Sequence, residues 1–170
     1  TTVAPPRQCS SSAWGDVHCV TMDGLRYDFQ GIGQYLFIDA LLFKILIELV
    51  PYGGGHVSVI DGVVFWDKQT STAIEVRHNL PTDIYINKTL SPISSNTVHT
   101  IIDNITVTKT GSDIVVEKPG HVTMKIVFQR GWMSIYQTIP GTFRGQLSGM
   151  AGDCDGDTSN DFTAGNATLW

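Results

Sequence analysis

Near the end of the sequence, four carboxylates and one carboxamide lie within nine residues: Asp153, Asp155, Asp157, Asn160 and Asp161. Unpaired carboxylates at close range repel one another by roughly 1 kcal/mol per pair even in a water-like dielectric. A cation is therefore expected among them. A ligand set made of oxygen atoms favours a hard cation with about six to eight ligands, and we predict calcium. A solvated turn that binds no ion is the alternative.

The first three aspartates of this loop have the spacing of an EF-hand, but the rest of the pattern does not fit. Thr158 stands at the sixth position, where an EF-hand has glycine, and Ala164 stands at the twelfth, where it has glutamate. No helical pattern flanks the loop. We therefore exclude an EF-hand.

Composition and motifs argue against several other classes of protein. The chain has eleven Lys and Arg residues and sixteen Asp and Glu residues, and the basic residues are scattered singly. No nucleic-acid partner is therefore expected. The longest apolar run, residues 40–50, contains Lys44 and Glu48 and is shorter than the ~20 residues of a membrane span, so no membrane insertion is expected. The sequence has no G-x-S-x-G, no H-E-x-x-H and no phosphate-binding glycine loop, and we expect no enzyme activity.

Other features indicate the extracellular space. Three asparagines lie in N-glycosylation sequons: Asn87, Asn104 and Asn166. Residues 1–12 are rich in Ser, Thr and Pro and are predicted to be a linker, with an ordinary frayed terminus as the alternative. Residues 13–170 then form one domain. We expect a glycoprotein that is secreted or belongs to a cell-surface ectodomain.

The elements that must position these residues follow a period of two. In residues 43–49 apolar side chains occupy one face, whereas Lys44 and Glu48 fall on the other, which is typical of a half-buried strand. Further short strands are expected at residues 57–60, 73–76, 84–86, 98–102, 105–108, 114–116, 122–128 and 133–137. Turn-forming residues separate them: Gly53-Gly54-Gly55, Asp61-Gly62, Asp103-Asn104, Gly111-Ser112, Pro119-Gly120 and Arg130-Gly131.

These patterns determine the expected fold class. No segment of about twelve residues combines helix formers, a cap and an apolar stripe, so a single helical turn at residues 142–146 is the most that we expect. We predict an all-β domain with little helix, in which two antiparallel sheets pack face to face as a β-sandwich, and a calcium-binding loop near the C-terminus.

Two long motifs at opposite ends of the chain carry a family resemblance. Residues 14–31 read W-G-D-V-H-C-V-T-M-D-G-L-R-Y-D-F-Q-G, and residues 149–162 read G-M-A-G-D-C-D-G-D-T-S-N-D-F. They resemble the opening signature of the von Willebrand factor type D domain, W-G-D-P-H followed by T-x-D-G-x-x-Y-x-F-x-G, and its closing signature, G-L-C-G-N-F-D-G-D-x-x-N-D-F. The motifs stand in the family's order and together span residues 14–162, so the resemblance covers nearly the whole chain.

The resemblance implies one calcium ion where the two signatures meet. Its ligands would be side-chain oxygens of Asp16, Asp153, Asp155, Asn160 and Asp161, and Asp157 would offer its backbone carbonyl. Two other aspartates of the opening motif are left out of this set, because Asp23 and Asp28 are expected to belong to the turn and the strand that follow.

The chain also departs from the family pattern. Many members have cysteine where this chain has Gly33 and Ala151, which makes it similar to a cysteine-poor branch found in membrane mucins and sushi-domain-containing cell-surface proteins. From the positions of Cys19 and Cys154 inside the two signatures we predict a Cys19–Cys154 disulfide, with Cys9–Cys154 and three free thiols as alternatives. Cys9 would then be left for a partner outside this chain, including a second copy in a homo-oligomer.

The resemblance implies a non-catalytic assembly or adhesion module that interacts with other extracellular modules or glycoproteins. Val17 replaces the proline at which some mucins cleave their own backbone, and no C-x-x-C is present for disulfide exchange, so neither activity is expected. The alternatives are an accessory domain of a secreted enzyme, similar to those in marine luciferases, or of a lipoprotein, similar to those in egg-yolk proteins.

Overall fold

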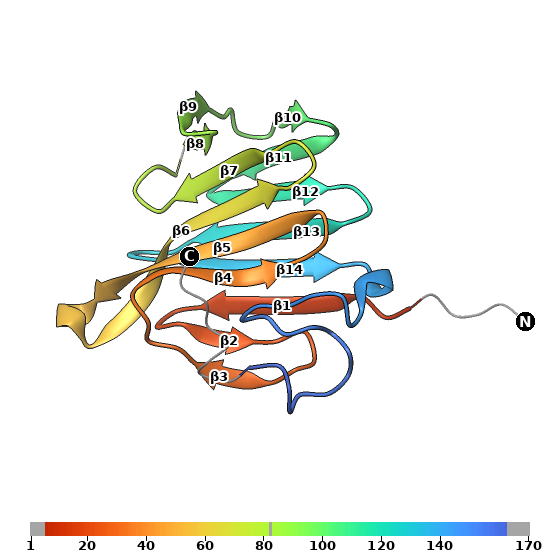
Figure 1. Ribbon diagram of the computed structural model, residues 1–170. Helices are drawn as coiled ribbons and strands as arrows, with labels where there is room; N and C mark the ends of the chain where they lie inside the picture. Colours follow the sequence, from red (N-terminus) through yellow and green to blue (C-terminus); the bar gives the residue numbers. More distant parts are fainter. Residues whose placement is uncertain (1–5, 82, 163–170) are drawn as a thin grey trace, which may run out of the picture.

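A computed structural model describes residues 6–81 and 83–162 of the chain (Figure 1). Within these residues the fold is all-β, and the other regular elements are two 3₁₀ turns, η1 (Gly53–Gly55) and η2 (Gly141–Phe143). The fourteen strands of the described chain are β1 (Cys9–Trp14), β2 (His18–Val20), β3 (Arg26–Asp28), β4 (Gly33–Asp39), β5 (Phe43–Tyr52), β6 (Val57–Asp67), β7 (Thr72–Arg77), β8 (Asp83–Ile86), β9 (Thr89–Pro92), β10 (Val98–Ile102), β11 (Ile105–Thr110), β12 (Asp113–Lys118), β13 (Val122–Phe128) and β14 (Met133–Ile139).

All nine strands expected from the period-two pattern lie inside observed strands. In β5, Phe43, Ile45, Ile47 and Leu49 are buried, as the alternation requires. The predicted turn at Asp61-Gly62 is wrong, because these residues lie within β6. Its pairing with β5 shifts register there, so the sequence produces an irregularity in one long strand rather than a chain reversal.

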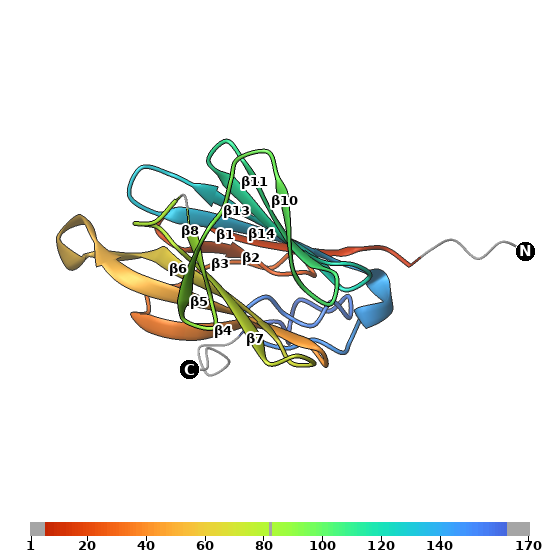
Figure 2. The same ribbon diagram turned by 90° about the horizontal axis from the view of Figure 1, so that it is seen from above.

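Hydrogen bonds join the fourteen described strands into a single sheet, in which neighbouring strands are antiparallel. The sheet forks at β14: Ile135 to Ile139 pair with β1, whereas Met133 pairs with Ile60 of β6. One arm holds β1–β3 and β10–β14, and the other holds β4–β9. Figure 2 shows the two arms curling over each other. A sandwich of two separate sheets is therefore not confirmed, although the layered arrangement is similar.

The space between the arms is filled by one core of buried apolar side chains from both of them. The largest include Phe37, Phe43 and Phe65, and the rings of Phe43 and Phe65 stack with centroids 5.8 Å apart. One ion pair also crosses this space. Lys118 Nζ at the end of β12 lies 2.6 Å from Asp67 Oδ1 at the end of β6, and both side chains are buried.

The first strand changes the predicted domain boundary. Residues 1–12 were expected to be a linker, but β1 begins at Cys9 and pairs with β14 from Cys9 to Ala13. Residues 9–12 therefore belong to the domain. The predicted helical turn at 142–146 is present only as η2, whose three residues overlap its beginning.

After β14 the chain returns along the outside of β4. Ser148 N donates to Asp39 O (3.0 Å), and Ala151 N donates to Phe37 O (2.9 Å). Gly149 between them has φ +107°, and a Cβ atom there would lie 2.7 Å from Phe37 O. The close approach of this segment to β4 therefore requires glycine.

We expect the Gly149→Ala substitution to lower the free energy of unfolding by about 1–3 kcal/mol, because it adds backbone strain and a clash with β4. Gly145→Ala is the matched control, since Gly145 also has a positive φ (+66°) but has open space around its Cα. Urea unfolding of both variants measures the difference. Equal losses in the two variants would contradict a close contact at Gly149.

Candidate metal site

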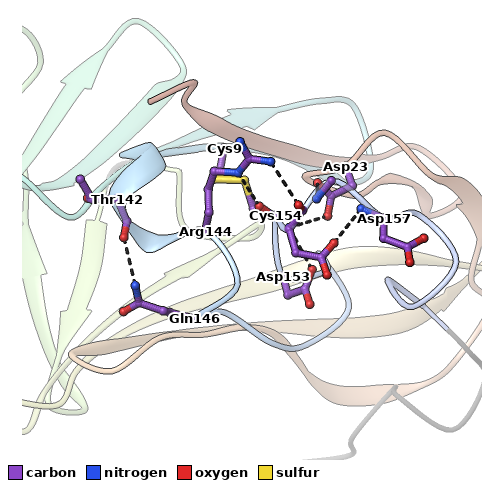
Figure 3. Close-up of a disulfide and its surroundings, with 10 residues drawn as sticks. Cys9, Asp23, Thr142, Arg144, Gln146, Asp153, Cys154 and Asp157 are labelled. Atoms are coloured by element: carbon purple, nitrogen blue, oxygen red, sulfur yellow. Dashed lines mark hydrogen bonds between the residues drawn. A yellow bond between two sulfur atoms is a disulfide. The ribbon is translucent and has the colours of Figure 1, made fainter. Parts of the chain in front are cut away.

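A disulfide fixes the returning C-terminal segment to β1. Cys9 and Cys154 are bonded, with Cα atoms 5.9 Å apart (Figure 3). The predicted Cys19–Cys154 bridge is therefore wrong, and Cys19 is a buried free thiol. Cys19 on β2 pairs with Ala13 on β1. Ala13 is four residues after Cys9 and so lies about 13 Å from it along the strand. A cysteine at that place is too far from Cys154 for a disulfide.

The bond also corrects the prediction for Cys9. This side chain is fully buried and is bonded within its own chain, so it is not the link to a second copy. Burial raises the pKa of the Cys19 thiol to about 12, which keeps that side chain protonated and unreactive.

Three carboxylates converge beside this disulfide. Oxygen atoms of Asp23, Asp153 and Asp155 all lie within 4.8 Å of one another. Asp23 comes from the turn between β2 and β3, whereas Asp153 and Asp155 flank Cys154 in the returning segment. Figure 3 shows Asp23 and Asp153 beside the disulfide. The cluster thus joins parts of the chain that are about 130 residues apart in sequence.

Backbone hydrogen bonds hold these carboxylates in place. Asp155 N donates to Asp23 Oδ2 and to Asp153 Oδ1 (both 3.1 Å), and Gly156 N donates to Asp23 Oδ1 (2.8 Å). On the other side of the loop, Arg144 donates to the carbonyl oxygens of Cys154 (3.0 Å) and Asp155 (3.2 Å). The guanidinium therefore orders the loop backbone, while the three carboxylates face one another.

A fourth carboxylate, that of Asp161, is buried beside them. Its Oδ2 accepts a hydrogen bond from Thr21, but its Oδ1 has no partner among the described residues. A Cβ atom on Gly152 would lie 2.3 Å from this Oδ1, so only glycine leaves room for it. Burial, together with the charges of Asp23 and Asp153, raises the pKa of Asp161 to about 6. We call Asp23, Asp153, Asp155 and Asp161 the acidic cluster.

The acidic cluster fits a calcium ion. Burial, and then the carboxylates of Asp155 and Asp23, also raise the pKa of Asp153, so a nearby cation would favour its charged form. A buried oxygen without a partner is costly unless an ion or a hydrogen-bond donor satisfies it. A divalent cation bound by these oxygens would offset the negative charges and would give the buried oxygen of Asp161 a partner. Calcium is suitable because it tolerates irregular sets of carboxylates and carbonyls.

The other predicted ligands lie around this cluster or away from it. Asn160 donates from Nδ2 to Asp155 Oδ2 (3.0 Å) and so supports a cluster residue. Asp157 is exposed, and hydrogen bonds from the side chain and then from the backbone N–H of Ser159 (N to Oδ1, 2.9 Å) lower the pKa of Asp157. Asp16 does not join the cluster and instead pairs with Nε2 of His18.

Sequence reasoning missed Asp23 as a cluster residue. The expectation that Asp23 belongs to a turn is correct for its backbone, but its side chain reaches across to the returning segment. The signal was its place in the opening motif, four residues before Tyr27, whose ring stacks on Phe162 of the closing motif (centroids 3.9 Å apart). Asp28, assigned to the following strand, is indeed the last residue of β3.

Two of the predicted glycosylation sites lie in described turns. Both asparagines are exposed: Asn87 directly follows β8, and Asn104 is the second residue after β10 and directly precedes β11. Asn166 lies outside the described residues.

The curled all-β domain and its disulfide define a module of the oxidising, extracellular kind. Residues 11–168 match the model of the von Willebrand factor type D domain, and the chain belongs to this family. Zonadhesin of Sus scrofa is 29% identical over 164 residues, which is 92% of this chain and 6% of zonadhesin. IgGFc-binding protein of Homo sapiens is 26% identical over 94% of this chain and 3% of that protein.

Sushi domain-containing protein 2 of Homo sapiens is also a relative, 23% identical over 94% of this chain and 20% of its own length. The chain therefore spans a small part of each of these relatives, which are secreted or cell-surface proteins, and it is an extracellular domain. In the part that the structure describes, no helix is both long and apolar enough to cross a membrane.

Proposed function

We propose that the chain is a non-catalytic structural module of a larger extracellular protein, and that a calcium ion in the acidic cluster stabilises it. In this role it mediates assembly or adhesion with other extracellular modules or glycoproteins. The carrying observation is that Asp23 and the pair Asp153 and Asp155 approach one another from opposite ends of the chain, beside the buried, unpartnered oxygen of Asp161. An ion held there would lock the closing loop onto the N-terminal strands.

The contacts of His18 support a non-catalytic role for this residue. Both of its ring nitrogens are engaged by carboxylates: Nδ1 by Asp28 (2.6 Å) and Nε2 by Asp16. Neither nitrogen is free to accept a proton from a nucleophile. His18 therefore has a structural role in the described chain: it links the loop that contains Asp16 to β3.

Thermal unfolding with calcium and with EDTA tests the proposal. At a calcium concentration about a hundred times Kd, binding adds roughly 2.7 kcal/mol to the free energy of unfolding. For a domain of this size, Tm should rise by about 5–10 °C. Asp23→Asn keeps the shape of the side chain and should abolish most of this shift, because it removes one of the three converging charges.

Glu117→Gln is the matched control, since Glu117 is an exposed carboxylate on β12 outside the cluster. It should leave the calcium-dependent shift unchanged. Magnesium should raise Tm less than calcium does, because it demands a stricter geometry and keeps its water ligands. The same Tm in calcium and in EDTA would mean that the acidic cluster is a solvated turn, and the calcium proposal would then fail.

A further inference from the structure

The sheet has four strands that, within the described residues, are paired on one side only: β3, β4, β9 and β10. An unpaired strand edge presents backbone N–H and C=O groups to which another chain can bond, and proteins protect such edges. Two of the four are protected here by the chain itself. The segment after η2 bonds along β4, and β3 is only three residues long, with the charged Arg26 and Asp28.

The edges of β9 and β10 lack this protection. In the described chain, no backbone segment bonds along the outer side of either strand. Both carry exposed apolar side chains: Leu90 on β9 is 48% exposed, and Val98 and Ile102 on β10 are 62% and 38% exposed. Pro92 at the end of β9 and a register shift near Ile102 interrupt each edge only at one point.

Each of these two strands adjoins a sequon. Asn87 and Lys88 form the two-residue turn between β8 and β9, and Asp103 and Asn104 form the turn between β10 and β11. All four residues have positive φ, as tight hairpin turns require. Both asparagines are exposed. The side chain of Asn87 accepts a hydrogen bond from Ala73 N (2.8 Å) at Oδ1, which leaves Nδ2 for substitution.

We propose that Asn87 and Asn104 carry N-linked glycans, and that these glycans shield the edges of β9 and β10 from pairing with another chain. The two hairpins lie at the same end of the molecule (Figure 1), so that two bulky, hydrated groups would cover both unprotected edges. The sequons thus stand beside the two strands that the chain does not protect by other means. This inference does not depend on the calcium ion.

The modification is a group transfer without a change in oxidation state. The donor is an oligosaccharide carried on a polyprenyl diphosphate. Nδ2 of asparagine attacks the first sugar at its anomeric carbon, so a carbon–nitrogen bond forms and the bond from that carbon to the diphosphate oxygen breaks. Nδ2 loses one proton, and the polyprenyl diphosphate leaves. Transfer to the unfolded chain would leave each glycan on an exposed turn after folding.

The test expresses the 170-residue chain in a eukaryotic secretory host and determines the occupancy of each sequon by mass spectrometry of its peptides. Thr89→Ala and Thr106→Ala remove the two sequons and keep both asparagines in their turns. Thr168→Ala removes the third sequon and is the matched control. Self-association of the purified proteins is followed by light scattering below Tm, in the presence of calcium. Enzymatic removal of glycans from the folded wild type gives a second route if a variant is poorly secreted.

We expect glycans at both Asn87 and Asn104. The double variant should associate severalfold faster than the wild type with an unchanged Tm, whereas Thr168→Ala should not. Adding Leu90→Lys and Val98→Lys to the double variant places charges on the bare edges and should restore slow association. The proposal is overturned if either site lacks a glycan, if glycan loss leaves association unchanged, or if the lysines fail to slow it.

Discussion

Replacing Cys9 and Cys154 together by serine should lower the free energy of unfolding by about 5 kcal/mol. The two cysteines are separated by 145 residues, so the bond closes a loop that includes nearly the whole domain. In the chain-entropy description, a loop of this length restricts the unfolded chain by about that amount. Urea unfolding in EDTA measures the loss without a contribution from calcium. Reductant should lower the stability of the wild type and leave the double variant unaffected.

Cys19→Ala is the control, because it removes a buried thiol of β2 that takes part in no disulfide. It should cost much less than the double serine variant and should leave the response to reductant intact. The pairing described here would be contradicted if Cys19→Ala abolished that response. It would also be contradicted if Cys9→Ser/Cys154→Ser unfolded at the same urea concentration as the wild type.

The second large effect is expected at the ion pair between the two arms of the sheet. Lys118→Met should lower the free energy of unfolding by about 3–5 kcal/mol, because it leaves the fully buried carboxylate of Asp67 without its cation. Thr70 still donates to Asp67 from N (2.9 Å) and Oγ1 (2.5 Å), but these neutral donors do not balance the charge. The double variant Asp67→Asn/Lys118→Met should recover part of the loss.

The loss of stability in Lys118→Met should depend on pH, and the pKa of Asp67 determines the direction. Burial alone would raise the pKa of Asp67, but the hydrogen bonds from Lys118 and Thr70 outweigh it and lower the pKa. A lowered pKa contributes stability that is present above the unfolded-state pKa, about 4, and is lost as the pH falls through the folded-state value. In Lys118→Met burial dominates and raises the pKa of Asp67. The difference in free energy of unfolding between variant and wild type should therefore begin to narrow above about pH 4, where the variant's carboxylate takes up a proton. It should narrow further below about pH 4, as the wild type loses its own contribution. A difference under about 1 kcal/mol at pH 7 would contradict this assignment.

Much of the fold was predictable because its strands are half-buried. Where one face of a strand meets the core and the other meets solvent, the alternation is visible in the sequence, as it is in β5. The strands of the opening motif were not found individually. β2 and β3 have only three residues each, which is too short for a period to be recognised. The fork at β14 was also not predictable, since it depends on which partner each half of one strand meets.

The site was predictable where its residues are neighbours in sequence. Asp153, Asp155 and Asp161 lie in one acidic loop, and their spacing alone indicated a cation. Asp23 and the Cys9–Cys154 bond depend on how two distant segments are placed side by side, which is a property of the tertiary structure. Composition made a disulfide at Cys9 harder to predict, because a segment rich in Ser, Thr and Pro is expected to be a linker. In the structure, pairing with β14 makes the segment that begins at Cys9 a strand.

The position of the disulfide also determines how the domain would respond to mechanical force. When such a chain is pulled at both ends, tension enters near Cys9 and leaves near Cys154, and the covalent bond between these residues carries it directly. The sheet between them is then bypassed, since none of its hydrogen bonds lies on the loaded path. Such a domain would transmit shear between its neighbours as a link of almost fixed length, and reduction of one bond would convert it into an extensible one.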